Sequence, residues 1–213
     1  MIDLHILHHV PSTTPDWWKA CIQSAQAAEA MGLCALHIIE ATGTSIGANR
    51  AAAFRLGQHP LVAYLDNDDV LIPEGIPAML AALAQRPDVC GVYSDRQQID
   101  DSGNVLFDLN RSAWRPEDHL CRVDFPHMLA IYRREAVTPH LATVATFENY
   151  SELVLSGLAV TAGPWLHVPT LAYQRREKSY YVGHVRPIPP DLAQRAHVAI
   201  LRPLLDAHRA RLS

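Results

Sequence analysis

A group of carboxylates interrupts the apolar stretch LVAYLDNDDVLIP, residues 61–73. Five apolar residues lead directly into Asp66, Asn67, Asp68 and Asp69, and Val70 then begins a second apolar run. Adjacent carboxylates repel one another and resist transfer out of water, so such a group is usually retained beside a buried segment when a positive charge compensates it. The pattern therefore predicts a bound cation or a cationic substrate here. Capping of a helix, the structural alternative, uses one carboxylate and not three.

The elements that must position these carboxylates are alternating strands and helices. Four apolar runs predict strands, at residues 2–10, 33–39, 61–65 and 89–93. Apolar residues with the spacing of one helix face follow Pro15 and Pro73, and the loop TGTSIGANRAAAFRLG leads into a helix that ends near Gly57. Strands separated by single amphipathic helices predict an α/β fold, with a mostly parallel sheet covered by helices on both faces.

Polar residues follow the carboxyl ends of the predicted strands. They are Ser12 and Thr13, Glu40, the Asp66 to Asp69 group, and Asp95. Carboxyl ends of parallel strands share one edge of an open sheet, where ligands bind, so we expect these residues to converge. The loop GTSIGANR lies on the same edge and offers backbone N–H groups and Arg50 to a nucleotide or phosphate. An ordinary loop between a strand and a helix explains its glycines equally well.

Length and composition limit the class of protein. The 213 residues are 49% apolar, which suits one domain with its own core. No stretch approaches the roughly 18 uncharged apolar residues that span a bilayer, and the N-terminus lacks the features of a signal peptide, so we expect a cytoplasmic protein. The net charge of −4 disfavours a general polyanion binder. The scattered cysteines predict buried free thiols, at Cys21, Cys34, Cys90 and Cys121.

Several segments, taken in order, resemble the family 2 glycosyltransferases of the GT-A fold. IGANRAAAFRLGQHPLVAYLDNDDVLIPEGI is similar to the family's central block, where a Gly-Ala-Arg-Asn-like helix start, a hydrophobic strand and an Asp-x-Asp element follow one another. Similar later segments are GVYSDRQQIDDSGN, HMLAIYRREAV, FENYSELVLSGLAV and LHVPTLAYQRREKS. The resemblance covers residues 1–180 and implies a Rossmann-like sheet in a single compact domain. It also implies transfer of a sugar from a nucleotide-diphosphate donor to a hydroxyl acceptor.

The resemblance assigns roles in the donor site. It implies that Asp68 is a direct ligand of Mg²⁺ or Mn²⁺, that Asp66 contacts the ribose or assists the metal, and that Asp69 supports them. The ion would neutralise the charge that develops on the departing diphosphate, most simply that of a uridine diphosphate (UDP) sugar. The implied contacts to the nucleotide come from Pro11, Ser12, Glu40, Arg50, Asp66, Asn67, Arg175 and Arg176.

The acceptor half departs from the family's pattern. The acidic pair whose Asp serves as catalytic base in inverting transfer falls in TFENYSEL, but here Glu148 is followed by Asn149, which cannot take a proton. Either Glu148 or Glu152 deprotonates the acceptor hydroxyl, or the register differs by one residue, or the protein transfers poorly. Asp95 and His127 are implied on the acceptor side.

The resemblance divides the chain into a donor half, residues 1–95, and an acceptor half, residues 96–186. Within the latter, YQRREKSYYVGHVRP combines basic and aromatic residues, and is either a lid over a diphosphate or a solvated loop. A nucleic-acid acceptor is less favoured than a glycan or another hydroxyl acceptor. Residues 187–213 predict a helical tail that packs on the domain or on a second subunit. The sequence does not indicate an oligomeric state.

Two alternatives remain open. LDNDDV also fits the nucleophile strand of haloacid-dehalogenase-like phosphatases, but their chemistry needs a later Lys and then an acidic pair. The only lysines are Lys19 and Lys178, and no adjacent acidic pair follows Lys178. The second alternative is a non-catalytic GT-A-like protein that binds a nucleotide or glycan, and Asn149 motivates it.

Overall fold

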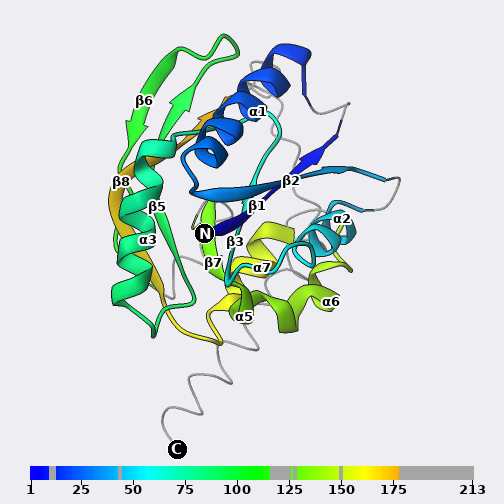
Figure 1. The fold of residues 1–213 in the computed structure, drawn as a ribbon, viewed down its shortest axis with the longest axis vertical. Coiled ribbons are helices and arrows are strands. Elements are labelled where there is room, and N and C mark those ends of the chain that lie inside the picture. Colours follow the sequence, from blue (N-terminus) through cyan, green and yellow to red (C-terminus); the bar gives the residue numbers. More distant parts are fainter. Residues whose placement is uncertain (10–12, 43–44, 116–125, 127–128, 149–150, 178–213) are drawn as a thin grey trace, which may run out of the picture.

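One mixed sheet forms the centre of the molecule (Figure 1). The structure, a computed structural model, describes residues 1–9, 13–42, 45–115, 126, 129–148 and 151–177. Within this part of the chain the strand order is β2-β1-β3-β7-β5-β8-β4, and β6 pairs with β5 outside that path. The strands are β1 Ile2–His8, β2 Cys34–Glu40, β3 Leu61–Leu65, β4 Val70–Leu71, β5 Gly91–Ile99, β6 Val105–Leu109, β7 Ala130–Arg133 and β8 Trp165–Arg176.

Most of the long strands run in the same direction. β1 is parallel to both β2 and β3, and β5 is parallel to β8. The short strand β7 lies between β3 and β5 and is antiparallel to both. β3 and β5 therefore run in the same direction, which is also that of β1, β2 and β8. β4 and β6 are antiparallel to their neighbours. The predicted mostly parallel sheet is confirmed, with β7 as an antiparallel insertion that the sequence analysis did not predict.

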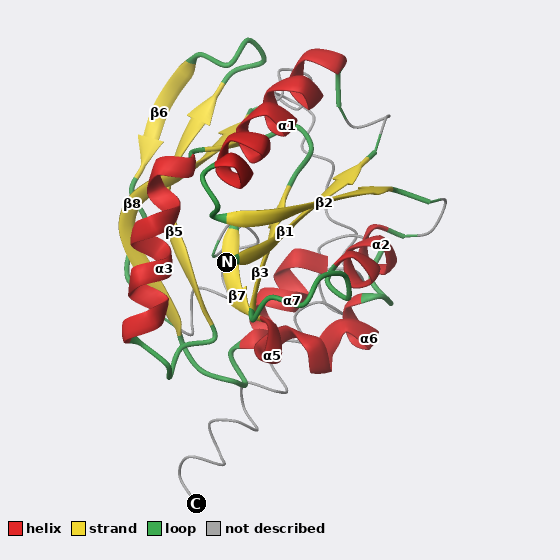
Figure 2. Cartoon of the chain, viewed as in Figure 1, coloured by secondary structure: helices red, strands yellow, loops and turns green. Residues whose placement is uncertain are grey.

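Helices cover both faces of the sheet (Figure 2). One face carries α1 Pro15–Ala30 and α3 Ile76–Gln85, and a 3₁₀ turn at Pro73–Gly75 precedes α3. The other face carries α2 Ile46–Ala53, α5 Arg134–Val137, a 3₁₀ turn at Thr138–His140, α6 Leu141–Val144 and α7 Ser151–Ala159. Side chains of β3 alternate between the two cores, because successive residues of a strand point to opposite faces.

The fourth strand is longer than predicted, and this corrects the place of Asp95. β5 continues to Ile99, so Asp95 lies inside the strand and not after its end. The extension exists because β6 and β8 pair with this part of β5 from both sides. The polar segment that follows Tyr93 has no local strand signal of its own. Residues 100–104 form the turn between β5 and β6, where the N–H of Gly103 donates to the carbonyl oxygen of Asp100 at 3.0 Å.

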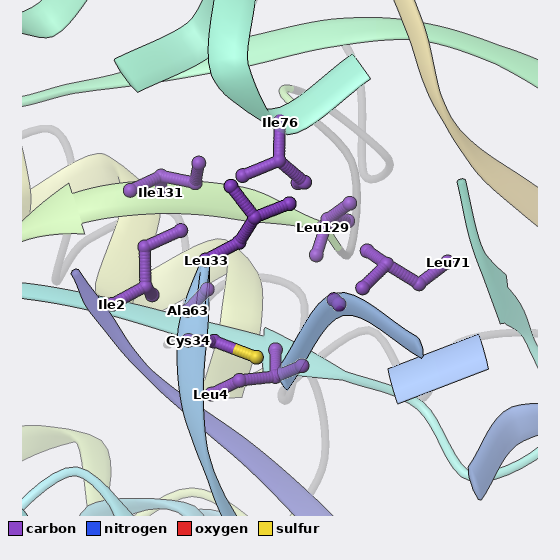
Figure 3. A pocket seen from close by; sticks show the side chains of 10 residues that line it. Ile2, Leu4, Leu33, Cys34, Ala63, Leu71, Ile76, Leu129 and Ile131 are labelled. Atoms are coloured by element: carbon purple, nitrogen blue, oxygen red, sulfur yellow. The ribbon is translucent and has the colours of Figure 1, made fainter. Parts of the chain in front are cut away.

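An apolar cavity lies between the sheet and α3 (Figure 3). Its volume is about 10 Å³, and the side chains around it come from Ile2, Leu4, Ala28, Leu33, Cys34, Ala63, Leu71, Ile76, Leu129 and Ile131. A space of that size holds about one water molecule at most and offers no side-chain polar partner except a thiol. We therefore treat it as a packing space of the core and not as a candidate site.

The described cysteines match the prediction. Cys21, Cys34 and Cys90 are buried and form no disulfide, whereas Cys121 lies outside the described residues. Among the helices of the described chain, none combines the length and the apolar character that crossing a bilayer requires.

A buried histidine on β1 makes the fold sensitive to acid. His5 lies with Nδ1 3.2 Å from the carbonyl oxygen of Ala63 and Nε2 3.3 Å from that of Leu56. Burial, assisted by the nearby His37, lowers the pKa of His5 to about 4. The unfolded chain therefore takes up a proton below pH 6.5 that the folded chain does not bind. This contribution to stability is complete above pH 6.5 and is lost as the pH falls towards 4.

We expect the free energy of unfolding to fall by about 2–3 kcal/mol between pH 7 and pH 4.5 through His5 alone. Urea denaturation of the wild type and of His5→Phe at both pH values measures it. The variant has no proton to bind at this position, so its loss should be smaller by that amount. An equal loss in both proteins would contradict the assignment.

Candidate active site

The acidic group lies in the turn between β3 and β4. Asp66, Asp68 and Asp69 each offer a carboxylate oxygen, and these oxygens lie within 4.8 Å of one another. The turn is closed by the N–H of Asp69, which donates to the carbonyl oxygen of Asp66 at 3.2 Å. The predicted gathering of these carboxylates is confirmed. Clustered oxygen donors of this type suit a hard divalent cation such as Mg²⁺ or Mn²⁺.

Asp69 is held by β8. Its Oδ1 accepts from the backbone N–H of Arg176 at 2.8 Å, and its Oδ2 accepts from the hydroxyl of Tyr173. The residue is 3% exposed. Burial, together with the charges of Asp68 and Asp66, raises the pKa of Asp69 well above its usual value. Both oxygens of Asp69 thus have protein partners, an arrangement that suits a supporting role.

Asp66 lies beside a buried arginine. Oδ1 of Asp66 is 3.7 Å from Nη2 of Arg50, whose guanidinium stacks over the ring of Tyr64 at 4.1 Å from the ring centroid. Burial raises the pKa of Asp66 to about 6, although the positive charge of Arg50 acts in the opposite direction. Asp66 is therefore a carboxylate that gains from a cation, because its present surroundings do not fully compensate its charge.

The same arginine joins the acidic turn to the start of α7. Nη1 of Arg50 donates to the hydroxyl of Ser151 at 2.8 Å and to Oε2 of Glu152 at 2.5 Å. Arg50 is 2% exposed, and its Nε has no hydrogen-bond partner among the described residues. Burial alone would lower the pKa of this guanidinium, but Tyr64, Glu152 and Asp66 raise it above its usual value. Three predicted site residues thus form one cluster, namely Asp66 in the acidic turn, Arg50 on α2 and Glu152 on α7.

The loop before α2 is shaped by packing. The hydroxyl of Ser45 accepts from the N–H of Ala48 at 3.1 Å, and the N–H of Gly47 donates to the carbonyl oxygen of Phe147 at 3.1 Å. A Cβ atom on Gly47 would lie 2.2 Å from that oxygen. The glycine therefore permits close contact between α2 and the segment before α7. These two N–H groups are engaged within the protein, which favours the structural explanation of this loop over phosphate binding.

Asp95 and His167 form a pair on β5 and β8. Oδ1 of Asp95 accepts from Nε2 of His167 at 2.8 Å and from the backbone N–H of Arg111 at 2.7 Å. The pairing registers align Ala63 of β3 with Val92 of β5 through β7. Asp66 follows β3 and Asp95 lies on β5, and these two strands are separated in the sheet by β7. His167 was not among the predicted site residues, and its only signal in the sequence is an imidazole in the apolar first part of β8.

Glu40 and Asn67 lie near the ends of the first two strands. Glu40 is 75% exposed on its side chain and accepts from Nδ1 of His8 at 2.9 Å, across the pairing of β1 with β2. Nδ2 of Asn67 donates to the carbonyl oxygen of His9 at 3.2 Å, which ties the acidic turn to the end of β1.

Some of the remaining predicted site residues lie in the described part of the chain and others do not. Glu148 is exposed and precedes α7, and Arg175 and Arg176 end β8. Four residues named in the predictions lie outside the described part of the chain, namely Pro11, Ser12, His127 and Asn149. Of the expected lid, residues 173–187, the first four residues belong to strand β8, and residues 178–187 lie outside the described part of the chain. The tail at 187–213 also lies outside it.

The sheet, the two helical layers and the acidic turn at the carboxyl edge define a GT-A fold with a candidate nucleotide-sugar site. The profile described as glycosyl transferase family 2 matches residues 14–138, which is more than half of the chain, and the chain belongs to this family. The family resemblance is thereby confirmed. No curated protein matched the sequence.

Solved structures of S. aureus TarS share the fold. TarS 1-349 in complex with UDP-GlcNAc superposes with a TM-score of 0.63 at 10% identity, and the match covers 94% of this chain and 66% of that one. The complex of the same fragment with UDP superposes with a TM-score of 0.59 at 9% identity, and the match covers 94% of this chain and 70% of that one. A longer TarS structure superposes with a TM-score of 0.57 at 9% identity, and the match covers 83% of this chain and 36% of that one. The chain thus spans about a third of the longer protein.

Proposed function

We propose that this glycosyltransferase depends on a divalent cation and moves a sugar, with inversion, from a UDP-sugar donor to a hydroxyl acceptor. The observation that carries the proposal is the acidic turn of Asp66, Asp68 and Asp69 at the carboxyl edge of a family 2 domain. The presence of UDP-GlcNAc and UDP in TarS structures supports the class of donor.

In this proposal, Asp66 and Asp68 hold Mn²⁺ or Mg²⁺, and β8 orients the turn through Asp69. When bound, the ion supplies positive charge at the leaving diphosphate. Arg50 adds a buried positive charge next to Asp66 and fixes the acidic turn relative to α7. That connection matters because donor and acceptor must meet in a defined geometry for the transfer to occur.

Glu148 is the proposed base for the acceptor hydroxyl. Of the two candidates, Glu152 is bonded to the buried Arg50, so its carboxylate is engaged in joining α7 to α2. Glu148 is exposed three residues before α7. The neighbouring Asp95 and His167 offer polar atoms to the acceptor, and His127 is proposed to join them.

The other assignments complete the proposal. Pro11, Ser12, Glu40 and Asn67 belong to the nucleotide side, and Arg175 is proposed near the diphosphate. Residues 1–95 form the donor half and residues 96–186 the acceptor half and lid, followed by a packed tail at 187–213, in a cytoplasmic protein. The match to glycosyl transferase family 2 argues against the phosphatase alternative. A non-catalytic binding protein remains the second candidate, since Asn149 stands at the usual place of the base.

A thermal-shift screen tests the proposal. We expect UDP, UDP-GlcNAc and other UDP-sugars to raise the melting temperature in Mn²⁺ and to lose most of this effect in EDTA, because a ligand that binds only the folded state stabilises it. Adenosine and guanosine diphosphates are the matched controls. Stabilisation without any release of UDP from the sugar would favour the non-catalytic candidate. A complete lack of metal-dependent stabilisation would contradict the proposed donor site.

A further inference from the structure

The side chain of Arg176 is built into the support of the acidic turn. This arginine ends β8 and is 6% exposed. Its Nε donates to the carbonyl oxygen of Asp68 at 2.9 Å. Its Nη1 donates to the carbonyl oxygens of Asp100 and Asp101 at 2.7 and 3.1 Å, in the turn between β5 and β6. One guanidinium therefore joins the acidic turn to a second turn that lies far from it in the sequence.

A tryptophan of α1 completes this arrangement. Nε1 of Trp17 donates to the carbonyl oxygen of Asp101 at 2.9 Å, and the guanidinium of Arg176 lies 5.3 Å from the centre of the Trp17 ring. Arg176 is thus held between an aromatic ring and backbone carbonyls. Fixed partners of this kind limit the freedom of the guanidinium to follow a ligand.

The backbone and side chains of β8 act on different parts of the turn. The N–H of Arg176 and the hydroxyl of Tyr173 hold the carboxylate of Asp69, whereas the guanidinium of Arg176 holds the backbone of Asp68. The backbone of Asp68 determines where its carboxylate points. The positive charge of Arg176 also opposes the mutual repulsion of the nearby carboxylates.

We propose that Arg176 is a positioning residue of the cation site, and not a ligand of the diphosphate as the sequence predicts. The inference rests on the proposed function, because it assumes that Asp66 and Asp68 bind Mn²⁺ or Mg²⁺. Tyr173 is the second positioning residue, acting through Asp69. Residues that orient metal ligands typically change metal affinity by about 10- to 100-fold when they are replaced.

The two roles of Arg176 predict different results in the absence of nucleotide. Replacing a positioning residue weakens the binding of Mn²⁺ even when no UDP is present. Replacing a ligand of the diphosphate weakens only the binding of UDP. Electron paramagnetic resonance of free Mn²⁺ measures its affinity for the full chain without UDP. The variants are Arg176→Met and Arg176→Lys, which remove the fork of donors, and Tyr173→Phe, which removes one hydroxyl at nearly constant volume. Arg86→Met is the matched control, since Arg86 pairs with Asp88 at the exposed end of α3.

We expect Mn²⁺ to bind at least about tenfold more weakly to the three site variants and unchanged to Arg86→Met. Far-ultraviolet circular dichroism identifies any variant that does not fold. If Arg176→Met is such a variant, Arg176→Lys and Tyr173→Phe decide the question. Wild-type Mn²⁺ affinity in the folded variants, with weaker binding of UDP, would overturn the inference and restore the diphosphate role. If the wild type itself bound no Mn²⁺, the proposed cation site would fail instead, and the inference with it.

Discussion

Replacement of Asp68 by alanine is expected to abolish the Mn²⁺-dependent part of UDP-sugar binding while the chain still folds. Asp68 and Asp66 are the proposed cation ligands of the acidic turn, whereas the carboxylate of Asp69 is bonded to β8. A single remaining carboxylate cannot hold the ion against the diphosphate with comparable affinity. Calorimetry with UDP in Mn²⁺ and in EDTA measures the two parts of the binding separately.

Asp88→Ala is the matched control for this experiment. Asp88 is an exposed carboxylate that pairs with Arg86 and lies outside the acidic turn. We expect the Asp88→Ala variant to bind UDP and Mn²⁺ with the affinities of the wild type. Undiminished affinity of Asp68→Ala for UDP in Mn²⁺ would refute the role of Asp68. The melting temperature of this variant without metal should not fall much, because the change removes a charge from a mutually repelling group.

Replacement of Glu148 by glutamine is expected to lower the rate of transfer by about 10²- to 10⁴-fold, the usual contribution of a positioned base. The affinity for UDP should change less than about twofold, because the amide keeps the size and polarity of the side chain. Release of UDP in the presence of an acceptor measures the rate, and calorimetry measures the affinity. The side chain of Glu148 is exposed, so the fold should be unaffected.

Glu152→Gln provides the contrast. Glu152 accepts from the buried Arg50, so its replacement weakens an ion pair that joins α2 to α7. We expect a lower melting temperature and a smaller loss of rate than for Glu148→Gln. The reverse order of the two rate losses would assign the base to Glu152. Wild-type rates in both variants would place the base elsewhere in the acceptor half.

The sequence determined the strands and helices whose signals are local. The apolar run of β3 was predicted at its observed bounds, and α1 begins at the predicted proline. The alternation of strands and helices gave the fold class, and the acidic turn gave the candidate cation site. These features depend on neighbours within a few residues, where apolar periodicity and turn-forming residues act directly.

Pairings between distant strands were decided only by the tertiary structure. β7 lies antiparallel between β3 and β5, and β5 extends past Asp95 because β6 and β8 hydrogen-bond to it. The polar residues of that extension carry little strand preference of their own. Their strand conformation follows from backbone partners supplied by other parts of the chain, which local patterns do not encode.

The roles of individual site residues were also decided at this level. The sequence showed three similar aspartates, but the contacts of Tyr173 and Arg176 with Asp69 distinguish that residue from Asp66 and Asp68. It showed two glutamates near α7, but only the packing of α2 brings Arg50 to Glu152. Burial and hydrogen bonding determine how a carboxylate behaves, and both depend on residues that are about a hundred positions away in the sequence. Residue types and spacing therefore defined the chemistry that is available, and the three-dimensional packing selected which side chain can perform it.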